Sequence, residues 1–574
     1  MNMTTGTFDT FDNNPLFYRR WSPAMGGNGR IMLLLHRGHE HSERLDGVAN
    51  NPVFADYTIY SYDYRGHGRT ETPATYEFMT LVRDLDAFAR FVCTTEGKGM
   101  EELFVVANSV AGVVASTWVH DYAPKVAGMA LIAPAFHIKL YAPFAKEFLE
   151  LAIRFKPEMN IKSYVKAHYL THDINEQLRY NEDPLITPNI PARQLTTLLD
   201  TGRRVVADAQ AIVVPTLVLS ATSDYVVDSR VQGDFFANLS SPLKRFIPLE
   251  GFYHGILYEE GAQQAVDAIG AFMEESFAAE TAAAPLETMV RWTRDECDRI
   301  AYGSVPLPRE IGYRLQRFLM KQLGFMSEGI SVGLRYGFDS GVTLDYVYEN
   351  EARGVSKLGE WIDRGYLDSI GWKGIRQRKV NSIATIRETI ETLLAAGEPV
   401  RILDIAGGPA RYLIELAAEY PQIEVRVRDY QEQNVEQGRR LAMERGLSNI
   451  SYAQVDAFDP ASYDPEGYRP NIAVISGVFE LFGENALIGN AIAGVASIIA
   501  EGGYLVYTGQ PWHPQLEQIA HVLGNHQQER WVMRRRSQVE LDRLFEDAGF
   551  EKEGMKIDDW GIFTVSVARF GGGR

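Results

Sequence analysis

Short runs of apolar and β-branched residues alternate with amphipathic stretches along this chain, and the runs fall into two separate sets. Strands of this length divided by helical stretches are typical of parallel sheets that carry helices on both faces. The sequence therefore predicts an α/β fold in each half of the chain. The expected strands of the first set are Ile31–Leu35, Tyr57–Tyr62, Leu103–Val106, Met129–Ile132 and Thr216–Leu219, and those of the second set are Ile402–Ile405, Val425–Arg428, Ile472–Ile475 and Tyr504–Tyr507.

The two sets predict two domains, although the length of 574 residues alone would allow about three. Their motifs differ, so duplication of one domain is not expected. The first domain is predicted over residues 1–277, and the small-residue stretch AAETAAAP within residues 278–287 predicts a linker. Residues 288–396 show no strand-like spacing and are expected to form a helical extension of the second domain, whose core is expected over residues 397–574.

The acidic composition argues against one large class of function. Lys and Arg number 57 against 75 Asp and Glu, which gives a formal net charge of −18, whereas a general nucleic-acid binder needs clustered positive charge. The opening residues carry acids and asparagines where a signal peptide would need an apolar core, and no apolar run has the length of a transmembrane helix. We expect a cytoplasmic protein with no nucleic-acid partner and at most peripheral membrane contact.

Two further properties bear on partners and cofactors. Cys93 and Cys297 offer no spacing for a zinc site or a disulfide framework, so no metal is expected. The sequence does not fix the oligomeric state, and a homodimer stays open.

Ser109 stands between the expected strand that ends at Val106 and a predicted helix, in the segment Ala107-Asn108-Ser109-Val110-Ala111-Gly112. A serine flanked by small residues at a strand-to-helix turn suits a nucleophile elbow, which lifts the hydroxyl above the sheet. The helix N-terminus behind it would favour a developing oxyanion. The local sequence alone also allows an ordinary serine cap of a helix.

Two later residues favour the elbow. Asp224 follows the expected strand that ends at Leu219, and His254 lies in a glycine-bounded loop. Ser, then Asp, then His is the chain order of a catalytic triad on an α/β-hydrolase sheet. In such a triad His254 acts as general base toward Ser109, while Asp224 holds the imidazole in the correct tautomer.

Residues 15–277 resemble the monoacylglycerol lipase and lysophospholipase group of α/β-hydrolases. The resemblance rests on the three segments Leu16–Trp21 (LFYRRW), His36–Ser42 (HRGHEHS) and Asp63–Arg69 (DYRGHGR). It implies a serine hydrolase for a lipid-like ester, an oxyanion hole from the backbone N–H groups of Gly38 and Val110, and a helical cap at about residues 136–205.

The chain departs from this group at positions where the group usually has glycine, namely Arg37, His39, Ala107 and Ala111. Arg37 and His39 beside the oxyanion loop could narrow the pocket or meet an anionic headgroup. Alanine can replace glycine at the elbow if its φ stays negative.

In the second half, acidic residues follow successive expected strands. Asp404 precedes the small-residue turn Ala406-Gly407-Gly408, Asp429 ends the next strand, and Asp456 follows the third. Small residues let a ligand approach the backbone, and an acid at the end of the second strand can bind ribose hydroxyls. The turn alone could be a tight strand–helix connection, and it is neither a strict G-x-G-x-x-G motif nor a P-loop.

This pattern resembles class I S-adenosylmethionine-dependent methyltransferases, which have a Rossmann-like fold, over roughly residues 330–570. Lys556–Trp560 and Phe563–Arg569 fit the last two strands of that fold, the final one antiparallel. The fusion of the two halves also resembles bacterial bifunctional hydrolase/methyltransferase proteins. The resemblance implies S-adenosyl-L-methionine as cofactor, bound by Asp404, Ala406, Gly407, Gly408, Asp429, Tyr430, Asp456, Ala457 and Ser476.

The methyl acceptor is less defined. No Asn/Asp-Pro-Pro-Tyr/Phe element follows the fourth strand, and neither cysteine lies in a catalytic motif, which disfavours nucleobase methylation. His513 lies just beyond the fifth strand and could act as a substrate-side base, or could be a structural residue. Two basic runs, within residues 371–379 and 533–536, are either solvated faces or sites for a phosphate or carboxylate.

The sequence thus predicts a bifunctional enzyme that hydrolyses a lipid-like ester of the monoacylglycerol or lysophospholipid type and methylates a small molecule or lipid headgroup. An alternative is an S-adenosylmethionine-binding sensor with a degenerate hydrolase-like binding domain. A third interpretation, an RNA methyltransferase with an accessory domain, conflicts with the net charge of −18.

Overall fold

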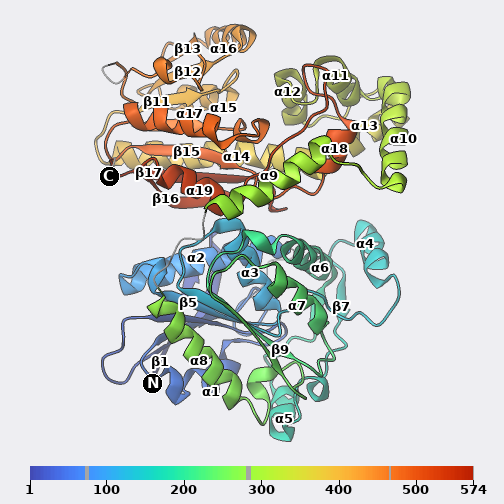
Figure 1. Cartoon of the computed structure of the whole chain (residues 1–574), viewed down its shortest axis with the longest axis vertical. Coiled ribbons are helices and arrows are strands. Elements are labelled where there is room, and N and C mark those ends of the chain that lie inside the picture. The colour runs from blue at the N-terminus through green and yellow to red at the C-terminus, as the bar shows by residue number, and fades with distance from the viewer. Residues whose placement is uncertain (72–75, 280–285, 465–466, 573–574) are drawn as a thin grey trace. The chain divides into compact units, whose positions relative to one another are not determined.

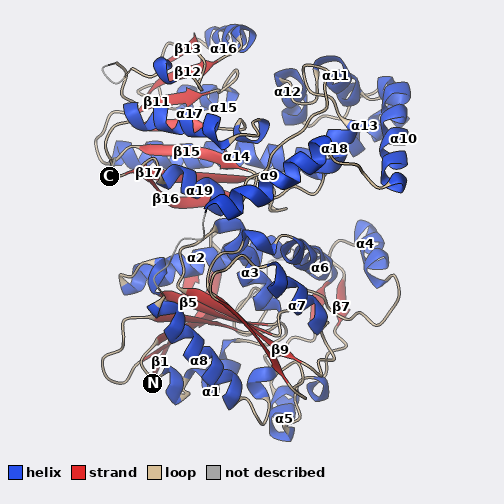
Figure 2. Cartoon of the chain, in the orientation of Figure 1, coloured by secondary structure: helices blue, strands red, loops and turns tan. Residues whose placement is uncertain are grey.

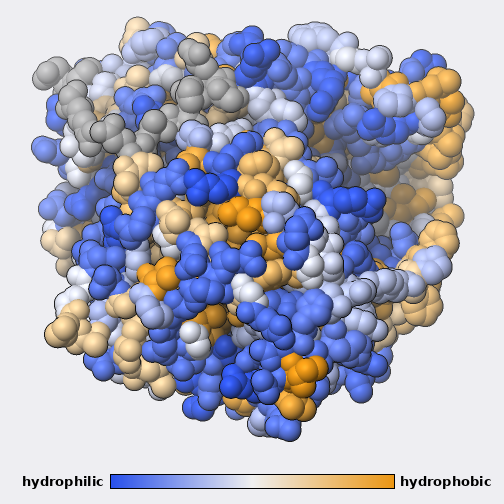
Figure 3. All heavy atoms as spheres, turned by 60° about the horizontal axis from the view of Figure 1, so that its bottom comes forward, coloured by the Kyte–Doolittle hydropathy of each residue, from blue (hydrophilic) through white to orange (hydrophobic). Residues whose placement is uncertain are grey.

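The computed structural model describes residues 1–71, 76–279, 286–464 and 467–572. The chain divides into two compact units, Met1–Pro285 and Leu286–Arg574 (Figure 1). Most of the linker predicted at residues 278–287 lies outside the described residues. No described helix is long and apolar enough to cross a membrane, and the face of the molecule in Figure 3 is mostly hydrophilic, with small scattered hydrophobic groups.

The first unit is built on an eight-stranded sheet of order β1-β2-β4-β3-β5-β6-β9-β10. β1 and β2 form an antiparallel hairpin, β2 pairs antiparallel with β4, and the remaining neighbours are parallel. The strands are β1 (Asn2–Asp9), β2 (Pro15–Ser22), β3 (Ile31–Leu35), β4 (Thr58–Tyr62), β5 (Leu103–Asn108), β6 (Gly128–Ile132), β9 (Thr216–Ala221) and β10 (Lys244–Leu249).

Helices cover both faces of this sheet (Figure 2). Every residue of β3, β5, β6 and β9 is buried, because central parallel strands lie between two helical layers. Phe272 and Met273 of one of these helices pack into the same core as Met32 of β3. The helices are α1 (Asp46–Ala49), α2 (Phe78–Glu96), α3 (Val110–Tyr122), α7 (Ser229–Asn238) and α8 (Gln263–Ala278).

The segment between β6 and β9 contains the predicted cap, and it is not purely helical. It holds α4 (Ala145–Phe155), α5 (Ile174–Glu182) and α6 (Ala192–Ala207) together with a small sheet of β7 (Asn160–Lys162) and β8 (Asn189–Pro191). The side chains of Phe144, Phe148 and Phe155, at and within α4, are exposed.

The second unit has a seven-stranded sheet of order β13-β12-β11-β14-β15-β17-β16. β17 lies between β15 and β16 and is antiparallel to both, while the other neighbours are parallel. This is the Rossmann-like arrangement with an inserted antiparallel final strand. The strands are β11 (Arg401–Ile405), β12 (Glu424–Asp429), β13 (Ile450–Gln454), β14 (Ile472–Ile475), β15 (Tyr504–Gly509), β16 (Phe550–Ile557) and β17 (Thr564–Phe570).

The predicted strand at Lys556–Trp560 is wrong, since β16 ends at Ile557. The carboxylate of Asp558 accepts hydrogen bonds from the backbone N–H groups of Trp560 and Phe563 at 2.8 and 2.6 Å. These bonds close a turn immediately after β16, so the chain reverses where the strand was expected to continue.

Residues 286–395 form helices that precede the sheet. Several of them begin at a serine whose hydroxyl accepts a backbone N–H of the first turn, as at Ser327, Ser340 and Ser356. The helices are α9 (Leu286–Tyr302), α10 (Leu307–Leu323), α11 (Glu328–Tyr336), α12 (Gly341–Glu349), α13 (Lys357–Leu367) and α14 (Ile370–Ala395), followed after β11 by α15 (Arg411–Glu419), α16 (Glu432–Glu444), α17 (Asn485–Ile498), α18 (Leu516–Val522) and α19 (Gln538–Glu546).

Candidate functional site

Ser109 occupies the turn between β5 and α3 in a strained backbone conformation, with φ 57° and ψ −111°. L-residues rarely adopt this region, and such strain is concentrated at functional sites. The Ser109 side chain makes no capping hydrogen bond to α3. The alternative of an ordinary cap serine is therefore wrong.

The neighbouring alanines fit the elbow, because neither Ala107 nor Ala111 has a positive φ. Gly112 is constrained more tightly. A Cβ atom on Gly112 would lie 2.7 Å from Cβ and 3.0 Å from Cα of Pro134. The close approach of α3 to the segment after β6 thus requires glycine at this position.

We expect Gly112→Ala to lower the free energy of unfolding by about 1–3 kcal/mol, because the added methyl group must displace Pro134. Thermal unfolding followed by circular dichroism measures this effect. Gly233→Ala in α7 is the matched control, since nothing lies within 4 Å of its added Cβ, and it should be neutral or stabilising. Equal melting temperatures for the two variants would contradict the steric argument.

The structure brings Ser109, Asp224 and His254 together. The Nε2 atom of His254 lies 2.8 Å from Ser109 Oγ, and its Nδ1 atom lies 2.7 Å from Asp224 Oδ2. All three side chains are buried. This geometry lets His254 accept the proton of Ser109 while its other nitrogen donates to Asp224.

Asp224 is held in place by its own loop. Its Oδ1 atom accepts the backbone N–H groups of Val226 and Val227 at 2.7 and 2.9 Å. Burial raises the pKa of Asp224, but the charge of His254 and the hydrogen bonds from His254 and the backbone lower that pKa further, and the net pKa lies below its usual value. The carboxylate therefore stays ionised, as a group that stabilises an imidazolium must.

The loop after β3 lies against the start of α3. A Cβ atom on Gly38 would lie 3.2 Å from Val110 Cγ2, so the two residues predicted to form the oxyanion hole are neighbours. Arg37 is buried and pairs with Glu40 at 2.7 Å. Burial lowers the pKa of His39 to about 4, and its Nδ1 atom lies 2.7 Å from the carbonyl oxygen of Thr187 in the cap segment. The charge of Arg37 is therefore paired with Glu40 and the ring of His39 is neutral, while Nε and Nη1 of Arg37 are buried without a hydrogen-bond partner among the described residues.

In the second unit, Asp404 lies one residue before the end of β11, and only one of its two carboxylate oxygens has a hydrogen-bond partner among the described residues. Tyr412 donates its hydroxyl to Asp404 Oδ2 at 2.7 Å, whereas Oδ1 is buried without a hydrogen-bond partner among the described residues. Burial, the main cause, and the nearby Asp429 raise the pKa of Asp404 to about 8. A cationic group beside Oδ1 would satisfy this oxygen and favour the ionised carboxylate.

The raised pKa of Asp404 predicts a pH-dependent stability. The folded state holds a proton that the unfolded chain releases at a lower pH, so this group makes unfolding progressively easier as pH rises toward about 8. Asp404→Asn removes the titration. Its melting temperature should match that of the unmodified protein near pH 4 and exceed it by an amount that grows as the pH rises to about 8; a gap that is constant with pH would contradict this account.

The turn after Asp404 has a backbone shape that lets a ligand approach the main chain closely. Ala406 and Gly408 both have positive φ, 55° and 58°. A Cβ atom on Gly407 would lie 2.1 Å from Asp404 Oδ2, so this position cannot carry a side chain while the carboxylate stays where it is. Ala406 adopts a left-handed conformation, which a glycine at this position would adopt more easily.

The other predicted cofactor residues lie at the same edge, because β13, β12, β11 and β14 are consecutive in the sheet. Asp429 accepts the backbone N–H of Gly408 at 2.9 Å, which joins the end of β12 to the turn after β11. Chain connections leave β11 toward both sides, and such a switch point is where α/β sheets bind ligands. Asp456 accepts the N–H of Phe458, Ala457 is buried, Tyr430 is 69% exposed, and Ser476 follows the end of β14.

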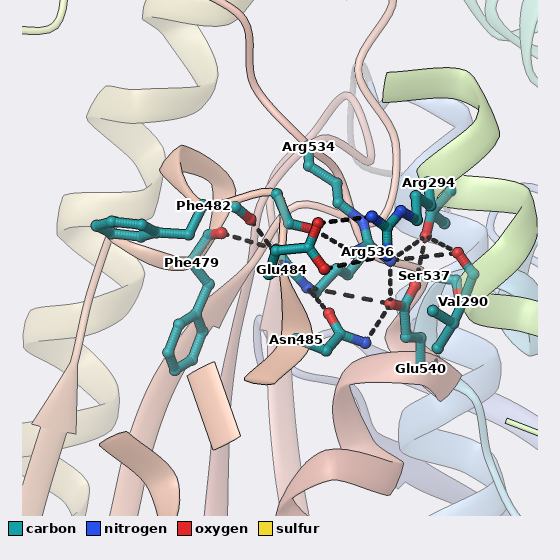
Figure 4. A network of polar contacts seen from close by, with 12 residues as sticks. Val290, Arg294, Phe479, Phe482, Glu484, Asn485, Arg534, Arg536, Ser537 and Glu540 are labelled. Carbon is teal, nitrogen blue, oxygen red and sulfur yellow. Dashed lines mark hydrogen bonds and ion pairs between the residues drawn. The ribbon is translucent and has the colours of Figure 1, made fainter. Parts of the chain in front are cut away.

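The basic run 533–536 is not a surface for phosphate. Arg534, Arg535 and Arg536 are buried, and their guanidinium groups bind carbonyl oxygens and carboxylates of this unit. Figure 4 shows the contacts of Arg534 and Arg536. Arg534 pairs with Glu540 at 2.8 Å, and Arg536 donates to the carbonyl oxygens of Phe479 and Phe482 at 2.7 and 2.8 Å. These bonds fasten the loop after β14.

The other basic run, residues 371–379, lies in α14 and is also engaged internally. Arg378 pairs with Glu480 at 3.0 Å, Lys379 pairs with Glu415 at 2.8 Å, and Arg376 donates to the carbonyl oxygen of Leu367. Tyr412 and Glu480 were not predicted to be site residues. Tyr412 lies in the first turn of the helix that follows β11, and Glu480 lies in the loop after β14. These two positions could have indicated a role in the site.

Comparisons with known proteins agree with the two-part architecture. A family model described as "Putative methyltransferase" matches residues 269–570, and one described as "Serine aminopeptidase, S33" matches residues 28–261. The chain is 43% identical over 569 residues to "Uncharacterized protein YnbC" of Escherichia coli (strain K12), which covers 98% of this chain and 97% of that protein.

Similarity confined to the first unit extends to lipases. "Monoglyceride lipase" of Rattus norvegicus is 26% identical over 263 residues, covering 43% of this chain and 82% of that protein. The solved structure of a Paleococcus ferrophilus monoacylglycerol lipase matches with 20% identity and a TM-score of 0.40, covering 48% of this chain and 100% of that one.

Proposed function

Because the chain belongs to the family described as "Putative methyltransferase", we propose that its second unit transfers a methyl group from S-adenosyl-L-methionine, and that its first unit is a serine hydrolase for a lipid-like ester. The hydrogen-bonded chain from Ser109 through His254 to Asp224, at 2.8 and 2.7 Å, carries the hydrolase proposal. The buried and unpartnered Oδ1 of Asp404 carries the methyltransferase proposal.

The hydrolase geometry supports an acyl-transfer mechanism. His254 Nε2 takes the proton of Ser109 as Oγ attacks the ester carbonyl, and Asp224 stabilises the resulting imidazolium. The backbone N–H groups of Gly38 and Val110 would bind the oxyanion. His254 then returns the proton to the leaving alcohol, and a water molecule activated in the same way releases the acid.

A monoacylglycerol or lysophospholipid is the ester class that we propose. The likeness to a protein named "Monoglyceride lipase" supports it, as do the exposed aromatic side chains at and within α4 of the cap segment. Hydrolysis of 1-monooleoylglycerol by the purified full-length protein, followed as released fatty acid, tests this class. A rate no higher than in buffer would contradict it.

The residues at the edge of the second sheet fit S-adenosyl-L-methionine. Asp404 would hold the amino group of the cofactor through its unpartnered oxygen, and Asp429 the ribose hydroxyls. Asp456 would accept from the adenine amino group. When bound, the cofactor supplies an activated methyl group on a sulfonium sulfur, so the protein needs mainly to orient the acceptor.

Isothermal titration of the full-length protein with S-adenosyl-L-methionine tests this second part. Saturable binding at one site in the second unit is expected, and its absence would remove the methyltransferase proposal. Binding that never leads to methyl transfer would instead favour a sensor of the cofactor.

A further inference from the structure

The second unit contains a cavity of about 320 Å³ whose walls come from α13, α14, α18 and the loops that follow β14 and β15. Its lining includes the aromatic side chains of Tyr366, Trp372, Trp531 and Phe563. Trp372 and Trp531 are stacked with ring centroids 6.2 Å apart, and Tyr366 meets Trp372 edge to face at 5.7 Å. Stacked indole rings with an apolar surround are suited to a flat ring.

The cavity reaches the edge of the sheet where the cofactor is proposed to bind. Gly477, which directly follows Ser476, lines it. The N–H of Gly477 donates to Thr508 Oγ1 at 2.8 Å, and a Cβ atom on Gly477 would lie 2.9 Å from Arg378 Nη2. A molecule in the cavity would therefore lie beside the turn after β14.

The charges of the cavity disfavour an anion. Among the described lining residues, Arg378 is the only cation, and Glu480 pairs with it at 3.0 Å. The Arg378 guanidinium also lies over the ring of Phe563, 4.9 Å from its centroid. Arg378 belongs to one of the two basic runs and is already paired, and the other cations of these runs do not line the cavity, so a lipid phosphate would enter without an unpaired counter-ion.

His513 presents a hydrogen-bond donor to the cavity and not a base. Its Nδ1 atom accepts the backbone N–H of Gln515 at 3.0 Å, so in the neutral ring the proton resides on Nε2. Nε2 has no hydrogen-bond partner among the described residues. Burial lowers the pKa of His513 to about 3, which keeps the ring neutral. The hypothesis that His513 acts as a substrate-side base is therefore not supported.

Resting on the proposed methyl transfer, we propose that this cavity is the methyl-acceptor site and that it takes an uncharged aromatic compound bearing a hydroxyl group. A hydroxyl oxygen can accept the Nε2–H of His513 with one lone pair and attack the methyl group with the other. A neutral amine has a single lone pair and cannot do both. The aromatic side chains of the lining pack against the ring, and His513 orients the oxygen.

The transfer step balances with groups that line the cavity. The bound cofactor would supply the methyl group: the hydroxyl oxygen would form a bond to the methyl carbon as the carbon–sulfur bond breaks, and that electron pair would stay on sulfur as a neutral thioether. The hydroxyl proton passes to the Glu480 carboxylate, directly or through a water molecule. Glu480 Oε1 is paired with Arg378, which leaves Oε2 for the proton.

Binding of 2-naphthol and of 2-naphthyl phosphate to the full-length protein tests the acceptor class. The two probes share a ring system and differ in charge. Isothermal titration should show 2-naphthol binding at least about tenfold more tightly, because the phosphate would be desolvated without a counter-ion. Tighter binding of the phosphate would overturn the proposal, as would displacement of bound S-adenosyl-L-homocysteine by 2-naphthol.

A matched pair of variants locates the probe. Gly365 lines the cavity and Gly312 does not, and a Cβ atom on either glycine would meet nothing within 4 Å. Gly365→Leu should weaken 2-naphthol binding about tenfold or more by occupying cavity space, while Gly312→Leu should not. Equal affinities would exclude this cavity as the site.

His513→Asn and His513→Phe separate the donor from a structural role. Asparagine keeps an N–H donor and should retain 2-naphthol affinity within a few-fold, whereas phenylalanine should lose about tenfold. The same loss in both variants would contradict orientation by a donor. Titration of the unmodified protein with S-adenosyl-L-methionine is run in parallel. If this protein does not bind the cofactor, the proposed function is refuted. If it binds the cofactor but not 2-naphthol, only the proposed acceptor class is refuted.

Discussion

Ser109→Ala is expected to lower kcat for p-nitrophenyl butyrate by about 10⁴-fold, because the substitution removes the Oγ atom that is placed to attack the ester, while His254 and Asp224 remain. A stopped-flow or spectrophotometric assay of the full-length protein measures this loss. The folded structure should persist, since Oγ makes no capping hydrogen bond to α3.

Ser116→Ala, on the same helix, is the control for this prediction. The Ser116 hydroxyl donates to the carbonyl oxygen of Gly112 at 2.7 Å and takes no part in the triad, so the rate should stay within a few-fold of the unmodified protein. If Ser109→Ala kept full activity, the serine-hydrolase proposal would fail. A loss of methyl transfer in the same variant would be unexpected, since the two sites lie in separate units.

Asp404→Asn is expected to weaken S-adenosyl-L-methionine binding by about 100-fold, because the amide cannot supply the negative charge that a cationic ligand would meet at Oδ1. Calorimetric titration near pH 7.5 measures the change. The side-chain shape is preserved, and the amide oxygen can still accept from Tyr412, so the loss would report charge and not collapse of the turn.

Asp459→Asn is a matched control for the second prediction. Asp459 lies in the loop after β13, where its carboxylate accepts the backbone N–H of Ala461 at 2.9 Å, and it is not among the proposed cofactor residues. Cofactor affinity should be unchanged. If Asp404→Asn bound the cofactor as tightly as the unmodified protein, Asp404 could not be the residue that holds the cofactor amino group, even if the protein bound the cofactor elsewhere.

The central strands could be predicted from sequence because they are buried on both faces and read as continuous apolar runs. The hairpin of β1 and β2 could not, since most residues of β1 are exposed and show no apolar alternation. The order of Ser109, Asp224 and His254 also indicated that these residues would meet, because each follows a strand whose carboxyl end faces the same edge. Their catalytic roles stay predictions.

Properties that depend on contacts made in the folded chain were out of reach. The run Arg534–Arg536 reads as a charged surface, and only the fold shows that its guanidinium groups bind carbonyl oxygens and carboxylates inside the unit. The tautomer of His513 depends on one backbone N–H two residues later. The end of β16 depends on the carboxylate of Asp558, which a strand propensity does not register.

The buried arginines restrict how this protein can be recombined with others. Arg534 binds the Val290 carbonyl and the Thr293 hydroxyl of α9, and Arg535 pairs with Glu296 of the same helix. An exchange of α9 for a helix from another source would leave these guanidinium groups buried beside mismatched neighbours, at a cost of about 3–5 kcal/mol for the broken Arg535–Glu296 pair. Domain shuffling would therefore have to move residues 286–574 as a single cassette, and grafting the sheet alone would give an unstable chimera.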